Sequence, residues 1–355
     1  MTVRKVGISV PRLGQSLLLA AAICGVQSAA VAASFSSQVF ATGAAVGATS
    51  ADSVTYGGGS VWVEYGNGAS STDYSGKGTI VQYSTSGAIQ NTYTLGGSVD
   101  GLKYNPNTGM VWALQNQDAN SQLSVINPAT KAITTYNYGA PYPSISESRG
   151  FDDVAFIGSD VYLSLTNPTS ATDPVVVKLN SATPSTPVSF STVLTQGSLL
   201  LTDPDSLKST PTGGLVQTGE HDSALTFINN PGAANQTATS LKLVAAPGTT
   251  IGSPDDSIYA TSGSGTFYLT DTSANTVYAL SATGLTVGSL FVNVGNEFGS
   301  VDLNTGVVTP IFTGTGLHGI EFVPAAATPE PASVGFSFLG LALGAVALIR
   351  KRSSK

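Results

Sequence analysis

Five aspartates recur along the middle of the sequence at nearly constant intervals, and each opens a short apolar segment. They are Asp52, Asp100, Asp152, Asp205 and Asp255, and successive members lie 48, 52, 53 and 50 residues apart. Carboxylate oxygens are the ligands that calcium prefers, so a site that gathered these side chains would bind Ca²⁺. In the alternative, each aspartate stabilises a local turn by accepting hydrogen bonds from backbone amides.

Other residue types that could do chemistry are few. His221 stands between Glu220 and Asp222, which is typical of a polar loop, and His318 opens the last apolar segment, which predicts a channel or core histidine. No Gly-x-Ser-x-Gly pattern marks a serine nucleophile. The two histidines are distant and the lone Cys24 lies in the leader described below, so we expect no zinc site and assign no catalytic residue.

The elements that must position the aspartates are strands. Charged residues make up 10% of the chain, whereas glycine, serine, threonine, asparagine and valine dominate, so long amphipathic helices are not expected. Apolar and polar residues alternate with period 2, and turn sequences separate the runs. Residues 121–126 and 132–136, joined by Asn-Pro-Ala-Thr-Lys, form the clearest predicted hairpin.

Each aspartate begins a unit of about 50 residues with room for four strands, which is typical of a β-propeller blade. In the fifth unit, for example, the strand at 255–259 is followed by its expected partner at 266–270. The pattern resembles the propeller families with NHL or YVTN-type repeats, and this resemblance implies the fold but no site residues. We predict an all-β, β-propeller-like body of about six or seven blades. A pair of β-sandwiches is the alternative.

The propeller hypothesis places the candidate residues. The first strand of each blade lines a central channel, so the five aspartates would surround one channel mouth. Residues 317–323 resemble a first strand with nothing after it, and we expect them to close a blade begun at the N-terminus. One way to count the blades gives residues 291–312 a blade of their own, for a total of six, or seven with the lead-in segment. Aromatic side chains that could stack on sugars are Trp62, Trp112, Tyr138 and Tyr142, although the spacing of the two tryptophans predicts blade-core positions.

The predicted body, residues 34–323, is strongly acidic. Together with the linker at 324–327, the body contains seven of the 14 basic residues of the chain and 20 of its 21 acidic residues, which gives a net charge of about −13. Such a surface repels nucleic acid and anionic membranes. No nucleic-acid partner is therefore expected, and no cofactor is assigned; weak binding of Ca²⁺ is the alternative.

The N-terminus, residues 1–33, has the pattern of a secretory signal peptide. Arg4, Lys5 and Arg12 form a basic region, residues 16–26 an apolar one, and small residues precede an expected cleavage after Ala32 or Ala33. Cleavage would remove Cys24 and leave a mature chain without disulfides. Signal peptidase is thus an expected processing partner.

The C-terminus has three parts in order, after a short linker at 324–327. Pro329, Glu330 and Pro331 come first, and residues 332–349 form an uncharged apolar run that, as a helix, would span roughly 27 Å of membrane. A basic tail at 350–355 closes the chain and would stay cytoplasmic. Its charged residues are Arg350, Lys351, Arg352 and Lys355.

Residues 328–355 closely resemble the PEP-CTERM sorting signal of Gram-negative bacteria, with Pro329, Glu330 and Pro331 matching its motif. The resemblance implies recognition by an exosortase, an inner-membrane-anchored intermediate, and delivery to the cell surface or extracellular matrix, in association with exopolysaccharide and biofilm. A plain membrane anchor is the alternative.

These observations favour an exported, non-catalytic surface protein with a structural, adhesive or exopolysaccharide-associated role. The alternative is a channel-site propeller hydrolase or lyase acting on a lactone or polysaccharide. That enzyme would require convergent carboxyl groups with perturbed pKa values in one pocket. A sugar-binding module would instead require a row of exposed aromatic side chains.

Overall fold

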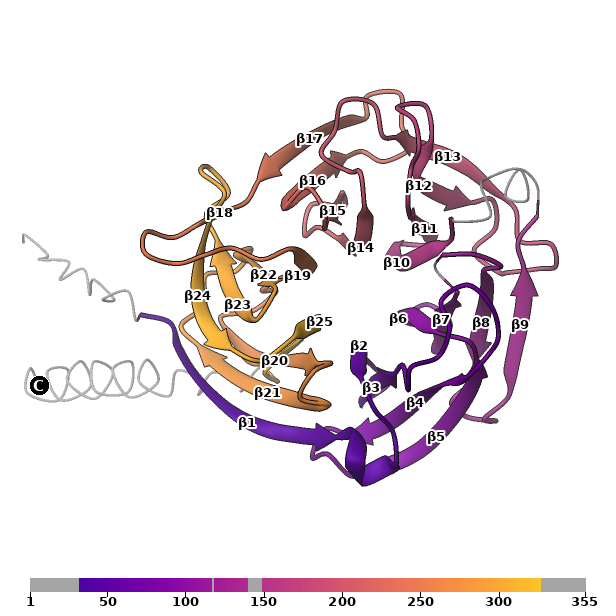
Figure 1. The fold of residues 1–355 in the computed structure, drawn as a ribbon, viewed down its shortest axis with the longest axis horizontal. Coiled ribbons are helices and arrows are strands. Elements are labelled where there is room, and N and C mark those ends of the chain that lie inside the picture. The colour runs from indigo at the N-terminus through magenta and orange to yellow at the C-terminus, as the bar shows by residue number, and fades with distance from the viewer. Residues whose placement is uncertain (1–31, 117, 140–148, 327–355) are drawn as a thin grey trace, which may run out of the picture. The chain divides into compact units, whose positions relative to one another are not determined.

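The computed structural model describes residues 32–116, 118–139 and 149–326, and these fold into six sheets around a central channel (Figure 1). The predicted all-β propeller is therefore confirmed with six blades, and the β-sandwich alternative is wrong. Within the described residues no helix is long and apolar enough to cross a membrane. The expected signal peptide and C-terminal helix lie outside them, apart from Ala32 and Ala33, which precede the first strand.

The first four blades follow the chain in order, and each runs antiparallel from the channel outward. Blade 1 contains β2 (Ala51–Gly57), β3 (Ser60–Tyr65), β4 (Lys77–Ser84) and β5 (Ile89–Gly96). Blade 2 contains β6 (Val99–Asn105), β7 (Met110–Gln115), β8 (Gln122–Ile126) and β9 (Ile133–Asn137). Blade 3 contains β10 (Phe151–Ile157), β11 (Asp160–Leu165), β12 (Pro174–Leu179) and β13 (Phe190–Thr195). Blade 4 contains β14 (Pro204–Ser209), β15 (Leu215–Gly219), β16 (Ala224–Asn229) and β17 (Thr237–Lys242).

The last two blades exchange strands. Blade 5 contains β19 (Pro254–Tyr259), β22 (Leu290–Val294), β23 (Glu297–Val301), β24 (Val307–Thr313) and the short parallel β18 (Val244–Ala245). Blade 6 contains β25 (Leu317–Pro324), β20 (Ser264–Asp271), β21 (Thr276–Thr283) and β1 (Ser34–Thr42), which leads into the short 3-10 helix η1 (Gly43–Val46). The hairpin β20–β21 thus leaves blade 5 after its inner strand and joins blade 6.

This exchange corrects two predictions. The strand that opens with Asp255 pairs with β22 and not with residues 266–270, and residues 291–312 complete blade 5 instead of forming a blade of their own. Aromatic packing across the two blades accounts for the arrangement, because the Phe267 ring on β20 lies 4.8 Å from Phe291, 5.0 Å from Phe298 and 4.7 Å from Phe322. The two blades therefore share one aromatic core.

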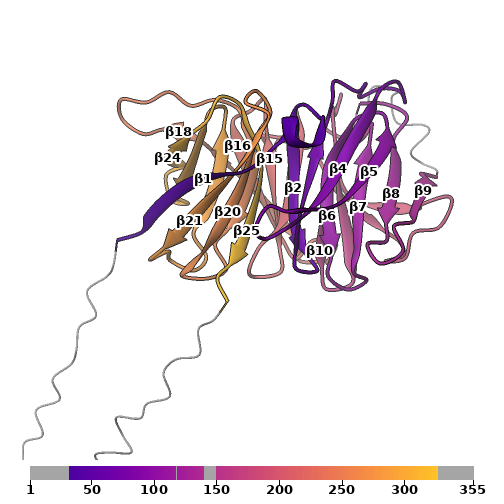
Figure 2. The same cartoon turned by 90° about the horizontal axis from the view of Figure 1, so that it is seen from below.

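The propeller closes as the sequence predicts, since β25 and the N-terminal strand β1 belong to the same blade. Ser34 pairs with Thr283 at the start of β1, and Pro324 pairs with Gly265 at the end of β25. Both ends of the body therefore leave blade 6 at one face, the lower one in Figure 2. The first residues of β25 lie at the opposite face.

The core lies between neighbouring blades, where the second strands are almost wholly buried. Trp62 and Trp112 are each 1% exposed, and the Trp62 ring packs 5.8 Å from that of Tyr93. The prediction that both tryptophans are blade-core residues is confirmed. Tyr138 is also buried, at 7% exposure, and Tyr142 lies outside the described residues.

Candidate functional site: an acidic cup at the channel mouth

A β-bulge at the same place in all six inner strands builds the site. In blade 1, Ala51 pairs with Tyr65 and Val54 with Val63, so the inner strand has one extra residue between these pairs. The other five inner strands show the same shift against their second strands. A bulge bends its strand and redirects a side chain. Each bulge contains one residue of a six-membered ring: Asp52, Asp100, Asp152, Asp205, Asp255 and His318.

The five aspartates that the sequence singled out thus lie together, and His318 is the sixth member. Sequence reasoning missed its membership, although its place at the start of the sixth inner strand was a usable signal. His221 lies in the exposed turn after β15 and is not a ring residue, as the loop interpretation predicted.

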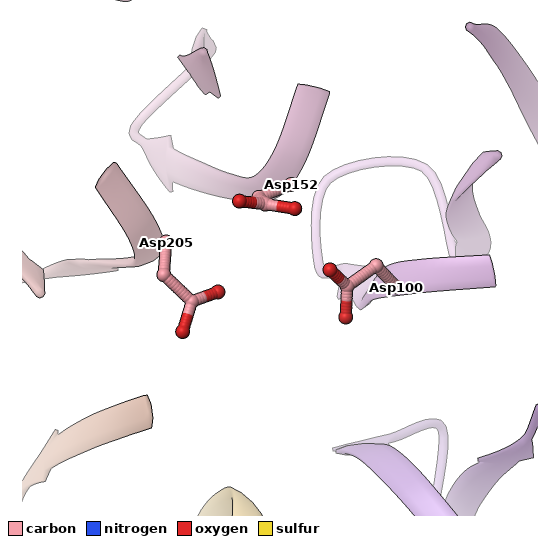
Figure 3. Close-up of side chains that lie close together, drawn as sticks. All are labelled: Asp100, Asp152 and Asp205. Carbon is pink, nitrogen blue, oxygen red and sulfur yellow. The ribbon is translucent and has the colours of Figure 1, made fainter. Parts of the chain in front are cut away.

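The ring has two unlike halves. Asp100, Asp152 and Asp205 each offer a carboxylate oxygen, and these atoms lie within 4.8 Å of one another (Figure 3). In the other half, His318 Nδ1 lies 3.0 Å from Asp255 Oδ1 and 3.2 Å from Asp52 Oδ1. One half is therefore purely acidic, whereas the other is an ion-paired histidine.

Burial and mutual repulsion control protonation in the ring. Burial, followed by the charge of Asp52, raises the pKa of Asp100 to about 7. Burial and neighbouring carboxylates likewise raise the pKa values of Asp152 and Asp205 well above the usual range. The charge of Asp255 raises the pKa of His318 to about 12, against the opposing effect of burial. Without a metal ion, protons must therefore offset part of the negative charge.

Above the ring the channel widens into a cavity of about 290 Å³, which we call the acidic cup. The ring residues line it together with Asp118, Thr166, Asn167, Asp203 and Glu220, so eight carboxyl groups face one histidine. Burial raises the pKa values of Asp203 and Glu220 as well. The cup therefore has a large excess of negative charge and suits a cation.

A larger groove adjoins the acidic cup. It measures about 910 Å³ and shares Asp118 and Asn167 with the cup, where Asn167 Nδ2 donates to Asp118 Oδ1 at 3.2 Å. Hydroxyl, amide and carboxyl groups share its lining with apolar atoms. The remaining lining residues are Thr72, Ala119, Asn120, Pro168, Thr169 and Thr202. The groove therefore offers hydrogen-bonding groups beside a comparable apolar surface.

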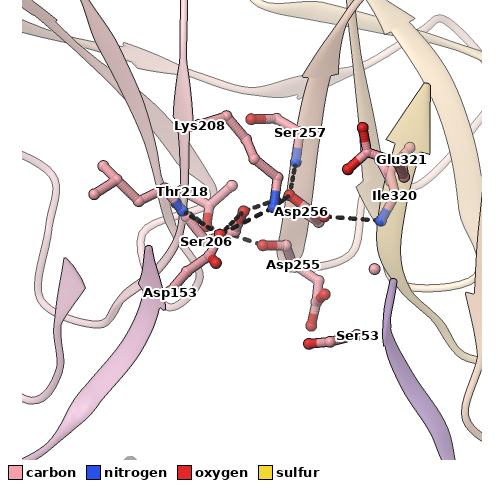
Figure 4. A network of polar contacts seen from close by, with 12 residues as sticks. Ser53, Asp153, Ser206, Lys208, Thr218, Asp255, Asp256, Ser257, Ile320 and Glu321 are labelled. Atoms are coloured by element: carbon pink, nitrogen blue, oxygen red, sulfur yellow. Dashed lines mark hydrogen bonds and ion pairs between the residues drawn. The ribbon is translucent and has the colours of Figure 1, made fainter. Parts of the chain in front are cut away.

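Below the ring, a buried ion cluster closes the channel (Figure 4). Lys208 Nζ lies 2.9 Å from Asp153 Oδ2 and 3.0 Å from Asp256 Oδ1, and the Ser206 hydroxyl donates to both aspartates. Burial lowers the pKa of Lys208, but the charges of Asp153 and Asp256 outweigh it and raise that pKa. The space left here is about 30 Å³, so the cup is blind. Sequence analysis did not find this cluster, although the Asp-Asp pairs at 152–153 and 255–256 hinted at it.

Backbone contacts between blades hold the ring residues in place. Thr218 Oγ1 on β15 donates to the carbonyl oxygen of Asp255 at 2.9 Å. Thr270 on β20 and Asn293 on β22 make the same contact with the carbonyls of Asp52 and His318. In these three cases the second strand of one blade fixes the ring residue of the next.

The acidic half of the ring fits a hard cation. Calcium takes six to eight oxygen ligands, and Asp100, Asp152 and Asp205 can supply three or more, with water or substrate completing the shell. The other half presents a charged imidazole oriented by two carboxylates. A substrate in the cup would therefore meet a candidate metal site on one side and a fixed positive charge on the other.

No family model and no curated protein matches the chain. Among solved structures, a protein provisionally described as a gluconolactonase is 10% identical, with a TM-score of 0.51 over 82% of this chain and 89% of its own. A gluconolactonase from Xanthomonas campestris is 10% identical over 77% and 79% of the two chains, with a TM-score of 0.48. A streptogramin B lyase is 14% identical over 83% and 74%, with a TM-score of 0.44. At these identities the likeness shows a shared β-propeller fold alone.

Proposed function

We propose that the acidic cup is the active site of a calcium-dependent hydrolase or lyase that acts on a lactone or a polysaccharide. One observation carries the proposal: carboxyl groups with raised pKa values converge on one blind cavity, opposite a charged histidine. Such perturbed groups cluster at functional sites. The convergence comes from six separate blades, each with the same bulge, so it is a repeated feature of the fold.

This proposal reverses the order of the two sequence-based hypotheses. The enzyme hypothesis required convergent carboxyl groups with perturbed pKa values, and the acidic cup has them. A sugar-binding module required a row of exposed aromatic side chains. Among the described residues, Tyr74 is the single aromatic in the set of exposed large hydrophobic side chains. The site chemistry therefore favours catalysis over a stacking platform.

The residues of the cup suit distinct roles. Asp100, Asp152 and Asp205 would hold Ca²⁺, which supplies positive charge for a substrate oxygen when it is bound. His318, charged and fixed by Asp255 and Asp52, would stabilise negative charge that develops on the substrate. Asp203 and Glu220 line the cup beside the ring, and burial raises their pKa values, which makes each a stronger proton acceptor than an exposed carboxylate.

The size of the site guides the choice of test substrates. The cup of about 290 Å³ is at the small end of ligand pockets and suits one small ring, whereas the adjoining groove of about 910 Å³ has room for a longer polar chain. Lactones are a reasonable first panel, because a propeller of the same fold is described as a gluconolactonase. Neutral and acidic oligosaccharides form the second panel.

The test combines binding and turnover. Calorimetry with CaCl₂ should show one site in the wild type and none in Asp152→Asn/Asp205→Asn, whereas the exposed-loop control Asp302→Asn should bind normally. Hydrolysis or elimination of the panel substrates should require calcium, stop with EDTA and be lost in the same double variant. Calcium binding without turnover of any panel substrate would contradict the proposed enzymatic activity. Absence of calcium binding would contradict the whole proposal.

Where the protein acts is a second and separate proposal. The sorting motif at 329–331 favours export and exosortase sorting to the cell surface. Both ends of the propeller leave blade 6 at the face opposite the ring, so a C-terminal tether would leave the acidic cup accessible. A structural, adhesive or exopolysaccharide-associated role would then apply if the cup binds calcium without turnover. Intact mass and fractionation test this: the wild type should lose its C-terminal segment, and Pro329→Ala/Pro331→Ala should stay membrane-bound at full length.

A further inference from the structure

The groove beside the acidic cup is formed by four connections between strands. Thr72 lies in the β3–β4 connection, residues 118–120 in β7–β8, residues 167–169 in β11–β12, and Thr202 in β13–β14. These connections lie at the ring end of the propeller, since β3, β7 and β11 end opposite the starts of the bulged inner strands and the fourth connection leads into β14. Asp118 and Asn167 line both spaces, so a chain molecule in the groove would have one end at the cup.

Hydrogen bonds between the connections fix one wall of the groove. Asn120 Nδ2 donates to the carbonyl oxygen of Thr72 at 2.8 Å, and the backbone N–H of Asp118 donates to the carbonyl oxygen of Ser71 at 3.1 Å. The hydroxyl of Tyr74 donates to the carbonyl oxygen of Asn120. The connections of blades 1 and 2 are therefore held together before any ligand arrives, which lowers the entropy cost of binding.

The hydroxyl groups of the groove are arranged to accept hydrogen bonds. Thr169 Oγ1 donates to Asp173 Oδ2 at 3.0 Å, and Thr202 Oγ1 donates to Asp222 Oδ2 at 2.9 Å. A threonine hydroxyl has one hydrogen and two lone pairs, so both hydroxyls have only lone pairs left for a ligand. The carboxyl group of Asp118 adds further acceptors. The groove therefore suits a ligand that carries many O–H donors.

The charge of the groove excludes acidic ligands. Among the described residues that line it, none is a lysine, arginine or histidine, and Asp118 is the single charged one. The neighbouring cup adds more negative charge. A carboxylate, sulfate or phosphate group would find no cation in the groove, and like charges would repel it. Ala119 and Pro168 supply apolar surface beside the polar groups, which suits the C–H faces of a sugar ring.

We propose that this groove binds the neutral sugar units of a polysaccharide through their hydroxyl groups and presents one end of that chain to the acidic cup. The volume of about 910 Å³ lies within the range of ligand pockets. The cleavage of the presented end rests on the proposed function, which the inference narrows to neutral, hydroxyl-rich sugar chains. The binding of sugar in the groove is independent of calcium and of turnover.

The first experiment measures sugar binding without calcium or catalysis. The proteins are the wild type and Asp152→Asn/Asp205→Asn, both in EDTA. The ligands are neutral tetrasaccharides of glucose, mannose or galactose, and acidic tetrasaccharides of galacturonic or mannuronic acid. Calorimetry and saturation-transfer NMR should show a neutral sugar bound to both proteins, roughly 10-fold or more tighter than any acidic one. Failure of every neutral sugar to bind, or equal binding of an acidic one, would overturn the proposal.

The second experiment locates the bound sugar with matched variants. Thr169→Val and Thr202→Val each remove one acceptor and should weaken binding of the neutral sugar roughly 2- to 10-fold, with normal melting curves. The control is Thr212→Val, an exposed residue in the turn between β14 and β15, at the far end of β14 from Asp205. It should bind as the wild type does. Unchanged binding by both groove variants would overturn the proposal.

A change of charge gives an independent check. Thr202→Lys places a cation in the groove, so it should weaken binding of the neutral sugar and strengthen binding of the acidic ones. If neither affinity changes, the sugar binds elsewhere and the proposal is wrong. Failure of the proposed function would look different: sugar would bind in the groove, but no panel substrate would turn over with calcium. Turnover of a lactone without any sugar binding would contradict only the inference about the groove.

Discussion

Asp100 and Asp152 lie on the inner strands of neighbouring blades, and each offers a carboxyl oxygen within 4.8 Å of the other and of one from Asp205. Burial and the neighbouring carboxylates raise the pKa values of both residues, so a proton on one of the pair offsets part of the repulsion. That proton occupies the acidic half of the ring, where a calcium ion would be bound by the same oxygens. Protons and calcium therefore compete for one site.

This competition predicts a steep dependence of calcium affinity on pH. Calcium requires ionised ligands, and the pKa of Asp100 is raised to about 7, so affinity should rise with pH from 5.5 to 8. Below that pKa, the calcium affinity should fall roughly 10-fold for each unit by which the pH is lowered, for every proton that calcium displaces. Calorimetry in two buffers of different ionisation enthalpy would count the protons released. An affinity that is flat over this range would contradict shared protonation.

The ion pair of His318 predicts a pH-dependent contribution to stability. The folded pKa is raised to about 12 from an ordinary value of 6.5, so the stabilisation is fully present below pH 6.5 and is lost as the pH rises towards 12. Because the side chain is 40% exposed, solvent screens the pair, and His318→Gln should cost about 1 kcal/mol at pH 6. Urea unfolding at pH 6 and pH 9 measures this.

The matched control for His318 is Asp255→Asn, alone and combined with His318→Gln. If the ion pair is the cause, the double variant should lose less unfolding free energy than the two single variants lose in sum. A cost for His318→Gln that stays constant from pH 6 to pH 9 would indicate a packing effect instead of charge.

The cluster below the ring predicts a larger effect. Lys208 is buried between Asp153 and Asp256, so Lys208→Met would leave two buried carboxylates uncompensated and should cost about 3–5 kcal/mol. Adding Asp153→Asn and Asp256→Asn removes both charges. Each amide oxygen can keep one of the two backbone N–H bonds that its aspartate accepts, and the other bond is lost, so only part of the loss should be recovered. Chemical unfolding of the single and triple variants at pH 7 measures both. A triple variant no more stable than the single one would rule out charge as the reason.

The sequence predicted the ring but not the means by which it forms. Regular spacing of Asp52 to Asp255 placed the five side chains at equivalent positions, and the fold of a propeller brings equivalent positions together. The bulge is a single extra residue between pairs such as Ala51–Tyr65 and Val54–Val63. An alternating pattern does not reveal one extra residue, because local sequence does not state which residues pair across strands.

The exchange of β20 and β21 was hidden for a related reason. The sequence pattern placed residues 266–270 beside the strand at 255–259, but two neighbouring sheets offer equivalent edges. The choice depends on contacts distant in sequence, such as that between Phe267 and Phe322, which lie on adjacent strands of blade 6. Likewise, Lys208 lies 55 residues from Asp153 and 48 residues from Asp256, so its ion pairs follow only from the closed ring.

Close packing at the bulge gives the last prediction. A Cβ atom on Gly101 would lie 2.2 Å from the carbonyl oxygen of Asp152, so Gly101→Ala must push the inner strands of blades 2 and 3 apart. Overpacking of this kind should cost about 1–3 kcal/mol, and it should separate Asp100 from Asp152 and weaken calcium binding. The control is Gly263→Ala, where the nearest atom to a new Cβ is Leu285 O at an ordinary 3.5 Å. Unfolding and calorimetry on both variants decide the matter: if Gly101→Ala binds calcium as the wild type does, the ring does not depend on this contact.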